Sequence, residues 1–289
     1  MVPSHRPRWR SLLYVPVTSE RFVAKAHERG ADAIILELED AVAPSEKDRA
    51  RALVPDAARR VGQGGADVLV RINRPWRLAV RDLEAVVGPD VRAVVLPKVD
   101  SAEHVLALAE IAASVEGERG LPVGHTLFFV RIEGPRGLLN AAGIAAAHPR
   151  VVAIGLGSSD YTIAAGMEAG GQGNAIASFL VVNAARAAGV EPLGLTGAIV
   201  GFADLEAFRR TAEQSRAMGL RGAPCVHPAQ VPILNDVFSP TDDDLERARR
   251  VVAEYERALA DGLGAITVDG EFVDVPYYEQ AKRLLTQER

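Results

Sequence analysis

Short apolar runs recur along the chain, and nearly every one is followed by a segment with the spacing of an amphipathic helix. Runs rich in Val, Ile and Phe are typical of strands buried on both faces, and strands joined through helices are parallel. The runs predict strands at Ser11–Val15, Ala33–Leu38, Asp67–Ile72, Ala93–Leu96, Leu127–Ile132, Val151–Leu156, Leu193–Ile199 and Pro224–His227. This alternation predicts an α/β protein, a (β/α)8 TIM barrel, with a doubly wound open sheet as the alternative.

Charged side chains gather where these predicted strands end. The residues are Glu39, Asp40, Arg71, Lys98, Glu133, Asp160 and His227. In a barrel the carboxyl ends of all strands surround one mouth, and side chains from different strands converge there. The distribution of charge therefore favours the barrel over the open sheet.

The fifth and sixth predicted strands each lead to an acid. Glu133 follows the fifth strand directly, and Asp160 follows the sixth after three small residues. One helical segment is expected between the two strands. Two carboxylates at one rim supply the hard oxygen ligands that Mg²⁺ prefers. The alternative is a pair of surface acids that form ion pairs with Arg131 or Arg136, an arrangement worth little energetically.

Other residues carry a weaker signal. Arg71 lies on an apolar strand, where its guanidinium needs an anion, either a structural carboxylate or a substrate. His227, before a proline, has the context of a structural histidine, and Cys225 that of a core residue. From composition alone, Asp274 is a turn residue and Lys25 lies on a solvated helix face.

Length and composition limit the classes of protein to which the chain can belong. A chain of 289 residues is long enough for one α/β barrel domain with an extension. The formal net charge of −5 gives no support for a nucleic-acid partner. No apolar run approaches the length of a membrane span, and none near the start resembles a signal peptide. A single cysteine excludes an intrachain disulfide and suits a cytoplasmic location.

The last part of the chain differs from the rest. After a predicted barrel domain at residues 1–240, residues 241–289 begin with a charged helix whose first turn has a capping box at Thr241. A hairpin with an Asp269-Gly270 turn follows, and then a closing helix. This helical and hairpin extension is too small to fold alone, so it is expected to pack on its own barrel or on a neighbouring subunit.

Taken in this order, the motifs of the chain resemble those of the citrate lyase β-subunit-like family, within the HpcH/HpaI aldolase group. The similarity runs from Ser11 to about Leu285 and includes members that act as malyl-CoA or citramalyl-CoA lyases. The segments that carry it include Leu13-Tyr14-Val15-Pro16, Lys25-Ala26, Leu38-Glu39-Asp40-Ala41-Val42, Val70-Arg71-Ile72-Asn73, Leu96-Pro97-Lys98, Ile132-Glu133, Gly157-Ser158-Ser159-Asp160, Val226-His227-Pro228-Ala229-Gln230 and Asp274-Val275-Pro276.

The resemblance implies a TIM barrel, usually a homotrimer, that binds Mg²⁺ through Glu133 and Asp160. Members of the family make or break the carbon–carbon bond between a 2-oxoacid and an acetyl unit held as a thioester. The resemblance therefore implies an oxo-acid lyase that uses a malyl-CoA, citramalyl-CoA or citryl-type thioester.

The resemblance also implies roles for single residues. Arg71 would stabilise the developing anionic oxygen of the substrate. Asp274 would lie on a C-terminal lid that reaches a neighbouring subunit's site, where it would exchange a proton with the acetyl-CoA enolate carbon. The residues expected against the substrate or CoA are Tyr14, Lys25, Arg71, Glu133, Val226 and His227.

Some positions depart from the family pattern. Ser159 stands where a glutamate is frequent, Ala223 where a lysine is usual, Ser178 where an arginine is common, and Glu37 where an aspartate is usual. None of these changes removes a predicted metal ligand. They leave the substrate open, and with it three alternatives: a CoA-independent 2-oxoacid aldolase, an acyl-CoA thioesterase, and a non-catalytic acyl-CoA-binding subunit.

Overall fold

The structure, a computed structural model, describes residues 7–168, 172–197 and 204–286. The chain divides into two compact units, Met1–Phe238 and Ser239–Arg289. Each unit has an apolar core of its own.

The first unit alternates strands with helices. Its strands are β1 (Ser11–Pro16), β2 (Ala33–Glu37), β3 (Asp67–Arg71), β4 (Ala93–Leu96), β5 (Leu127–Ile132), β6 (Val151–Leu156), β7 (Glu191–Pro192) and β8 (Ala223–Cys225). Its α-helices are α1 (Glu20–Ala26), α2 (Lys47–Val61), α3 (Trp76–Val86), α4 (Ala102–Glu118), α5 (Pro135–Leu139), α6 (Ala141–Ala145), α7 (Ser158–Ala164), α8 (Gly173–Ala188), α9 (Leu205–Ala217) and α10 (Val231–Val237). Among the described residues, no helix has the length and apolar character needed to cross a bilayer.

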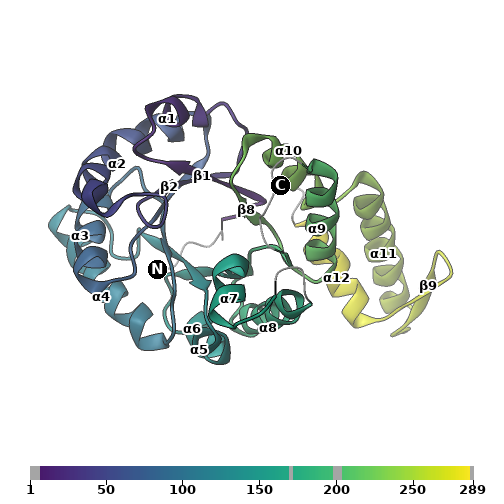
Figure 1. Ribbon diagram of the computed structural model, residues 1–289. Coiled ribbons are helices and arrows are strands. Elements are labelled where there is room, and N and C mark those ends of the chain that lie inside the picture. Colours follow the sequence, from purple (N-terminus) through teal and green to yellow (C-terminus); the bar gives the residue numbers. More distant parts are fainter. Residues whose placement is uncertain (1–6, 169–171, 198–203, 287–289) are drawn as a thin grey trace. The chain divides into compact units, whose positions relative to one another are not determined.

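The eight strands form one parallel sheet with the order β7-β6-β5-β4-β3-β2-β1-β8. The sheet is curled, and the helices lie on its outer side (Figure 1). Two backbone hydrogen bonds join the segments at its two ends: Arg221 N donates to Pro192 O at 2.9 Å, and Gly194 N donates to Gly222 O at 2.8 Å. The predicted parallel α/β architecture is confirmed and is TIM-barrel-like. A doubly wound sheet does not fit, because its strand order would reverse at a switch point.

The alternation of side chains along the strands decides what the inside of the curled sheet contains. Successive residues of a strand point to opposite faces. Ile34 packs in the core between sheet and helices, whereas Ile35 and Leu69 pack in a second core inside the sheet. Two residues further along the same strands, Glu37 and Arg71 occupy the inner face at the carboxyl ends. The inside of the sheet is therefore apolar below and charged at its mouth.

The seventh strand differs from its prediction. It covers Glu191–Pro192, not Leu193–Ile199, and residues 198 and 199 lie outside the described residues. The eighth strand covers Ala223–Cys225 and so begins one residue earlier than expected. Both are short and are defined by pairing with a neighbouring strand, β6 for β7 and β1 for β8, rather than by a local apolar pattern.

The segment between β5 and β6 forms two helices, α5 and α6, where the sequence predicted one. They meet at Asn140, whose side chain donates to the carbonyl oxygen of Asp100 at 2.8 Å. The backbone of Asn140, with a φ of −100° and a ψ of 4°, departs from helical values at this junction.

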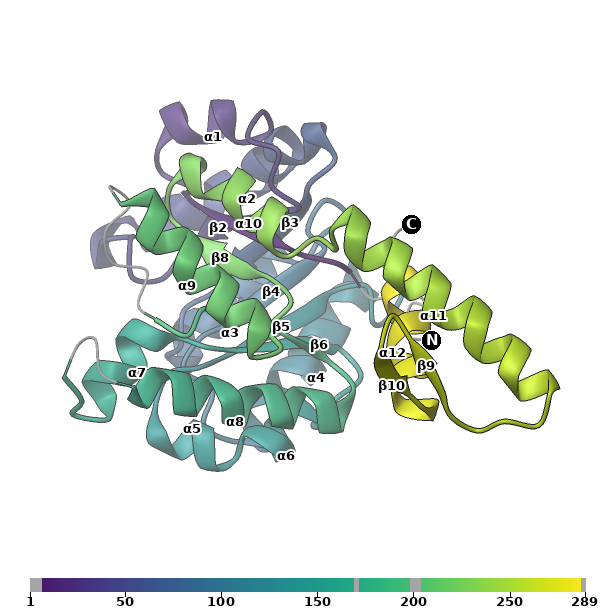
Figure 2. The same ribbon diagram turned by 90° about the vertical axis from the view of Figure 1, so that its right-hand side faces the viewer.

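The second unit contains α11 (Asp242–Ala260), the antiparallel hairpin of β9 (Ile266–Val268) and β10 (Glu271–Val273), and α12 (Val275–Leu285) (Figure 2). Thr241 and Asp244 form the predicted capping box of α11. The hairpin turn has positive φ at both Asp269 (52°) and Gly270 (81°), as a primed two-residue turn requires. The predicted helix, Asp-Gly turn and hairpin are therefore confirmed in this part of the chain.

Candidate functional site

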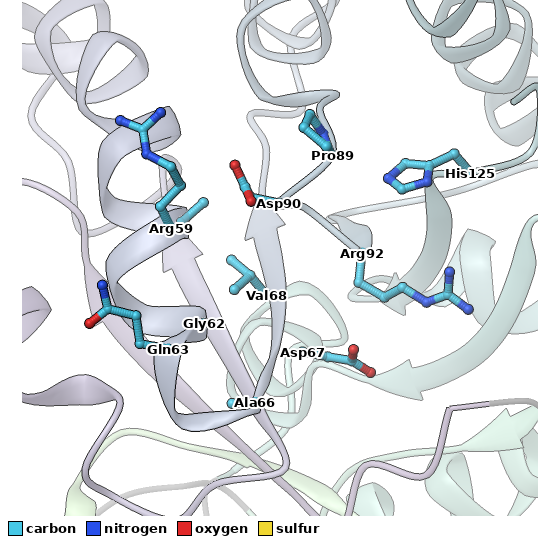
Figure 3. A pocket seen from close by; sticks show the side chains of 11 residues that line it. Arg59, Gly62, Gln63, Ala66, Asp67, Val68, Pro89, Asp90, Arg92 and His125 are labelled. Carbon is cyan, nitrogen blue, oxygen red and sulfur yellow. The ribbon is translucent and has the colours of Figure 1, made fainter. Parts of the chain in front are cut away.

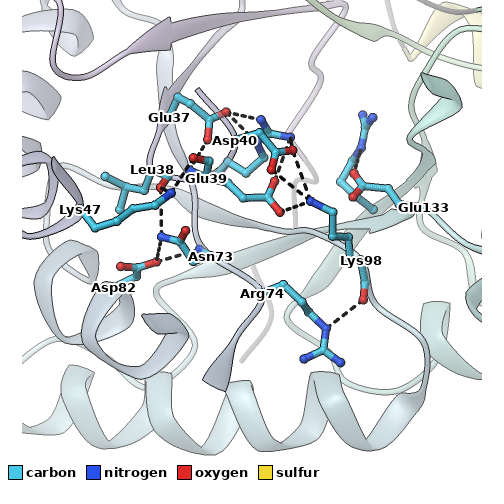
Figure 4. Close-up of polar contacts among 12 residues, drawn as sticks. Glu37, Leu38, Glu39, Asp40, Lys47, Asn73, Arg74, Asp82, Lys98 and Glu133 are labelled. Carbon is cyan, nitrogen blue, oxygen red and sulfur yellow. Dashed lines mark hydrogen bonds and ion pairs between the residues drawn. The ribbon is translucent and has the colours of Figure 1, made fainter. Parts of the chain in front are cut away.

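The carboxyl ends of β2 to β5 bring together a set of charged side chains that we call the mouth cluster: Glu37, Glu39, Arg71, Lys98 and Glu133 (Figure 4). The sequence predicted charged residues at these strand ends, and the sheet order explains why the residues meet. β2, β3, β4 and β5 are successive neighbours in the sheet. Parallel pairing places their carboxyl ends side by side.

Arg71, at the end of β3, is held by two buried glutamates. Its Nε and Nη2 both lie 2.6 Å from Glu37 Oε2, and its Nη1 lies 3.1 Å from Glu39 Oε2. Burial raises the pKa of both carboxyl groups and Arg71 opposes this shift. Burial by itself would lower the pKa of Arg71, but Tyr14, Glu37 and Glu39 raise it above the ordinary arginine value. Arg71 is therefore a fixed cation with a set orientation.

Lys98, after β4, lies on the other side of Glu39. Its Nζ is 2.5 Å from Glu39 Oε1 and 3.3 Å from Asp40 Oδ2. Burial would lower the pKa of Lys98, but its hydrogen bond with Glu39 and the negative charge of that residue raise it to about 12. Lys98 also has a φ of 52°, a conformation that residues with side chains rarely adopt. Glu39 is thus neutralised from both sides, by Arg71 and by Lys98.

A layer of contacts behind the mouth fixes the turn that follows β2. Lys47 Nζ donates to the carbonyl oxygens of Leu38 and Glu39, each at 2.6 Å. Asn73 Nδ2 donates to Leu38 O at 3.0 Å and to Asp82 Oδ2 at 2.7 Å. These bonds satisfy buried backbone carbonyls, so the segment carrying Glu39 cannot move freely.

Glu133, directly after β5, is buried, and neither of its carboxylate oxygens has a hydrogen-bond partner among the described residues. Its contact with Arg131 Nε, at 3.6 Å, is an ion pair too long to be a hydrogen bond. Gly157 leaves room for it, because a Cβ at position 157 would lie 2.3 Å from Glu133 Cγ. Burial raises the pKa of Glu133 to about 6, and Glu39 and Asp160 add to the increase.

Asp160 lies in the first turn of α7, directly after β6, and is partly buried. Its charge acts on Glu133, so the structure brings the two predicted metal ligands within electrostatic range of each other. The described residues contain no cluster of three or more His, Cys, Asp or Glu side chains that could hold a metal ion by themselves. A buried carboxylate with open oxygens beside a second carboxylate fits Mg²⁺, which uses few protein ligands and keeps other positions for water and substrate.

Tyr14, on β1, lies in the mouth and contacts Arg71, whose Cζ is 5.0 Å from the centre of the tyrosine ring. Its hydroxyl oxygen is buried without a hydrogen-bond partner in the described structure. Burial raises the pKa of Tyr14, and the positive charges of Arg131 and Arg71 oppose this increase. Tyr14 is thus part of the polar inner surface.

Of the remaining predicted site residues, Lys25, Val226 and His227 belong to the first unit and Asp274 to the second. Lys25 is exposed in the last turn of α1. Val226, 48% exposed, and the partly buried His227 follow β8, and both of their backbone N–H groups donate to Gln230 Oε1 at 3.1 Å. Asp274 belongs to the second unit and is the N-cap residue of α12, although its side chain makes no capping hydrogen bond. Its Oδ1 is buried and has no partner in the described part of the chain.

Cys225 is fully buried in β8, and burial raises the pKa of its thiol to about 12. A thiol with so high a pKa is not a nucleophile at neutral pH. The interpretation of Cys225 as a core residue is confirmed.

Sequence reasoning assigned no site role to two residues that the structure places here. Glu37, treated only as a departure from a family pattern, is the main partner of Arg71. Arg131, treated only as a possible ion-pair partner, is buried inside the sheet. Both residues could have been found from the alternation of side chains along a strand. This alternation puts Glu37 on the face of Ile35 and Arg131 on the face of Phe129.

A cavity of about 320 Å³ lies at the other end of the first unit (Figure 3). Asp67, the first residue of β3, and Arg92, directly before β4, line it together with Arg59 and His125. These residues belong to the amino ends of the strands, the end of such folds that serves stability rather than chemistry. The mouth cluster is therefore the candidate site, and this cavity is not part of it.

Fold and site together define a class: a TIM-barrel-like α/β protein with buried acids and an oriented arginine at the carboxyl ends of its strands. The chain belongs to the HpcH/HpaI aldolase/citrate lyase family, whose sequence profile matches residues 10–228. The family resemblance drawn from the sequence motifs is therefore confirmed.

Relatives of known activity are similar over almost the whole chain. The citrate lyase subunit beta of Escherichia coli K12 is 33% identical over 284 residues, covering 96% of this chain and 92% of its own length. A (3S)-malyl-CoA thioesterase of Cereibacter sphaeroides is 36% identical over 291 residues, with 96% and 94% covered. An L-malyl-CoA/beta-methylmalyl-CoA lyase of the same species is 32% identical over 310 residues, with 99% and 96% covered.

Solved structures agree with this assignment. The protein CitE of Mycobacterium tuberculosis, in complex with magnesium, acetoacetate and coenzyme A, matches with a TM-score of 0.76 and 29% identity. The match covers 98% of this chain and 99% of the CitE chain. These similarities support a CoA-related lyase as the general class of activity.

Proposed function

We propose that the protein is a Mg²⁺-dependent carbon–carbon lyase. Its substrate is a malyl-CoA, citramalyl-CoA or citryl-type thioester, which it cleaves to a 2-oxoacid and acetyl-CoA or forms in the reverse direction. The observation that carries the proposal is the buried carboxylate of Glu133, which has no hydrogen-bond partner among the described residues and whose pKa responds to the charges of Asp160 and Arg71. Membership of a lyase family and a magnesium-containing structural neighbour support it.

Glu133 and Asp160 would hold the metal ion. Bound there, Mg²⁺ would supply Lewis-acid polarisation of a substrate oxygen. Arg71 faces the same mouth with a permanent charge and stabilises the oxygen as it becomes anionic. Because Glu37 and Glu39 hold Arg71 in place, no reorganisation of the guanidinium is needed during the reaction.

In the cleavage direction the bond between the carbinol carbon and the acetyl carbon breaks, and its electron pair forms the thioester enolate. The hydroxyl passes its proton to water and becomes the ketone, while the enolate carbon gains one proton and becomes the methyl group of acetyl-CoA, so the proton count is unchanged overall. Asp274 is the proposed proton donor to that carbon. Its Oδ1, which has no partner in the described residues, and the exposed apolar residues near it in sequence, Phe272, Val275 and Tyr277, support a role as a lid that closes over a thioester. The lid acts on a neighbouring copy within a homotrimer.

Incubation with citramalyl-CoA and malyl-CoA tests the proposal. Pyruvate or glyoxylate is expected to appear together with acetyl-CoA, and EDTA is expected to abolish the reaction until Mg²⁺ is restored. The absence of any metal-dependent cleavage of these thioesters and of citryl-CoA would refute the lyase.

A thioesterase is the second candidate, favoured by the relative that is a (3S)-malyl-CoA thioesterase. The same assay separates the two activities by their products. Hydrolysis of malyl-CoA releases free CoA thiol and malate, whereas cleavage releases glyoxylate and leaves the thiol acylated.

A further inference from the structure

Lys98 has a backbone conformation that a residue with a side chain disfavours. Its φ of 52° lies in the left-handed region, where the Cβ comes too close to the backbone. Such a conformation persists only where the surrounding structure holds it, and it is frequent at functional sites. Lys98 is a member of the mouth cluster, with its Nζ 2.5 Å from Glu39 Oε1. The contacts that hold its backbone therefore also set the position of its charge.

Two contacts hold the residue that follows Lys98. The backbone N–H of Val99 donates to the carbonyl oxygen of Arg131 at 3.2 Å. The carbonyl oxygen of Val99 lies against Gly137, where a Cβ would be only 2.4 Å from that oxygen. Both contacts act on Val99, and neither involves the carbonyl group of Lys98.

The carbonyl oxygen of Lys98 is bound by a side chain from the turn after β3. Arg74 Nε donates to this oxygen at 3.0 Å (Figure 4). Arg74 has support of its own, because its Cζ lies 5.9 Å from the ring centre of Trp76. The Trp76 ring, on a residue that is 43% exposed, packs edge-on against the buried His104 with centroids 4.9 Å apart. The guanidinium thus reaches Lys98 from a supported position.

The direction of the Lys98 side chain decides the balance of charge in the mouth cluster. Its Nζ contacts Glu39 and Asp40, and the charge of Glu133 also acts on it. On its other side Glu39 faces Arg71. A change of φ at Lys98 to the ordinary negative range would turn its Cα–Cβ bond and carry Nζ away from Glu39. That buried carboxylate would then keep one cation in place of two.

We infer that Arg74 is a positioning residue for the mouth cluster: its hydrogen bond to the Lys98 carbonyl oxygen holds the left-handed backbone that directs Nζ onto Glu39. The effect on turnover rests on the proposed function, in which Glu39 helps to orient Arg71. The position of the Lys98 ammonium group can be measured without any turnover.

Amine-selective acetylation of the whole protein at about pH 9, quantified by peptide mass spectrometry, tests the inference, because only the deprotonated amine reacts. Lys98 of the wild type is expected to react slowly, since the contact with Glu39 stabilises the ammonium form. Arg74→Met should raise the rate at Lys98 about tenfold and leave the exposed Lys25 unchanged. Arg74→Lys, which keeps a donor, should give an intermediate rate at Lys98.

Arg77→Met is the matched control, because Arg77 is an exposed arginine in the first turn of α3. It should leave Lys98 at the wild-type rate. A positioning role also predicts that Arg74→Met lowers kcat for the thioester several-fold with little change in KM, and that Arg74→Lys recovers part of kcat.

A wild-type rate at Lys98 in Arg74→Met would overturn the inference, because the contacts of Val99 would then suffice to hold the backbone. An equal rise at Lys98 and Lys25 would also overturn it, since that result reports a general loosening of the fold. If Arg74→Met does not fold, Trp76→Leu carries the same test: removing the ring beside Arg74 should give a smaller but selective rise at Lys98. Failure of the proposed function is separate, because a protein that cleaves no thioester can still show the Arg74-dependent reactivity of Lys98.

Discussion

At the scale of single residues, three glutamate side chains of the site have different roles. Glu37 and Glu39 are bound to cations, and Glu133 has no hydrogen-bond partner among the residues that the structure describes. The first two therefore position Arg71, and the third is available to a metal ion. Burial raises the pKa of all three, so their different roles come from their partners and not from exposure.

Glu37→Gln tests the positioning role. Removing one partner of a buried ion pair leaves the other charge less compensated, here with Glu39 as the remaining buried partner of Arg71, so the free energy of unfolding should fall by about 3 kcal/mol. Turnover of the thioester should fall about tenfold or more through kcat with little change in KM, because in the proposed reaction Arg71 acts in the transition state. Denaturant unfolding and steady-state kinetics measure the two effects.

Glu46→Gln is the control for this substitution, since Glu46 forms an exposed ion pair with Arg49 that is worth less than about 1 kcal/mol. Glu37→Asp, which keeps the charge, should recover part of kcat. A Glu37→Gln protein as active and as stable as the wild type would show that Glu39 alone suffices to orient Arg71.

At the scale of elements, the junction of β6 and α7 serves the site in two ways. It carries Asp160 in the first turn of the helix and presents Gly157 to the side chain of Glu133. The backbone N–H of Gly157 also donates to the carbonyl oxygen of Ile132 at 2.8 Å, which ties this junction to the end of β5. The two acids are therefore positioned by one connection between neighbouring strands.

Gly157→Ala tests this arrangement. The added methyl group would overlap Glu133 Cγ, so the carboxylate must shift. Affinity for Mg²⁺, measured by calorimetry, should fall about tenfold or more, because metal sites tolerate little displacement of a ligand. Stability should fall by about 1 to 3 kcal/mol through overpacking.

Gly134→Ala is the matched control, because a Cβ at that position meets no atom within 4 Å. It should leave Mg²⁺ affinity unchanged. Equal Mg²⁺ affinities in the Gly157 and Gly134 variants would show that Glu133 is not a ligand of the metal ion.

At the scale of the whole molecule, the chain has two units with separate cores, and each supplies part of the proposed chemistry. The mouth cluster belongs to the first unit, and Asp274 belongs to the second. The second unit is held by its own contacts, including the stacked rings of Tyr255 and Tyr278 with centroids 4.8 Å apart. A substitution of Asp274 should therefore leave the fold of the first unit intact.

Asp274→Asn should keep the thermal stability of the wild type and lose most of the turnover, because the amide cannot donate the proton. Coexpression with Arg71→Ala then tests whether the lid acts between copies. Each variant alone should be inactive. Mixed oligomers should regain measurable activity, since some sites combine an intact Arg71 with an intact Asp274 from another chain. Mixtures that stay inactive would place both residues in the site of a single chain.

The sequence by itself determined the local elements with strong apolar or capping signals. The bounds predicted for the fifth and sixth strands agree with β5 and β6, and the Asp269-Gly270 turn and the Thr241 cap are present as expected. The sequence also predicted Arg71, Glu133 and Asp160 at strand ends. Parallel strands joined by helices have their carboxyl ends on one rim, so these residues were expected on the same side of the fold.

Only the tertiary structure decided how the charges are distributed among partners. Side chains from different strands meet inside the sheet, and this decides which glutamate holds Arg71. It also decides that Glu133 and Arg131 keep hydrogen-bonding atoms without a partner among the described residues. The seventh strand was predicted at Leu193–Ile199 but lies at Glu191–Pro192 for the same reason, since its pairing with Ala153 and Ile154 makes it a strand. Apolar periodicity is a local property that sequence carries, whereas pairing among buried charges is set by distances between segments far apart in the chain.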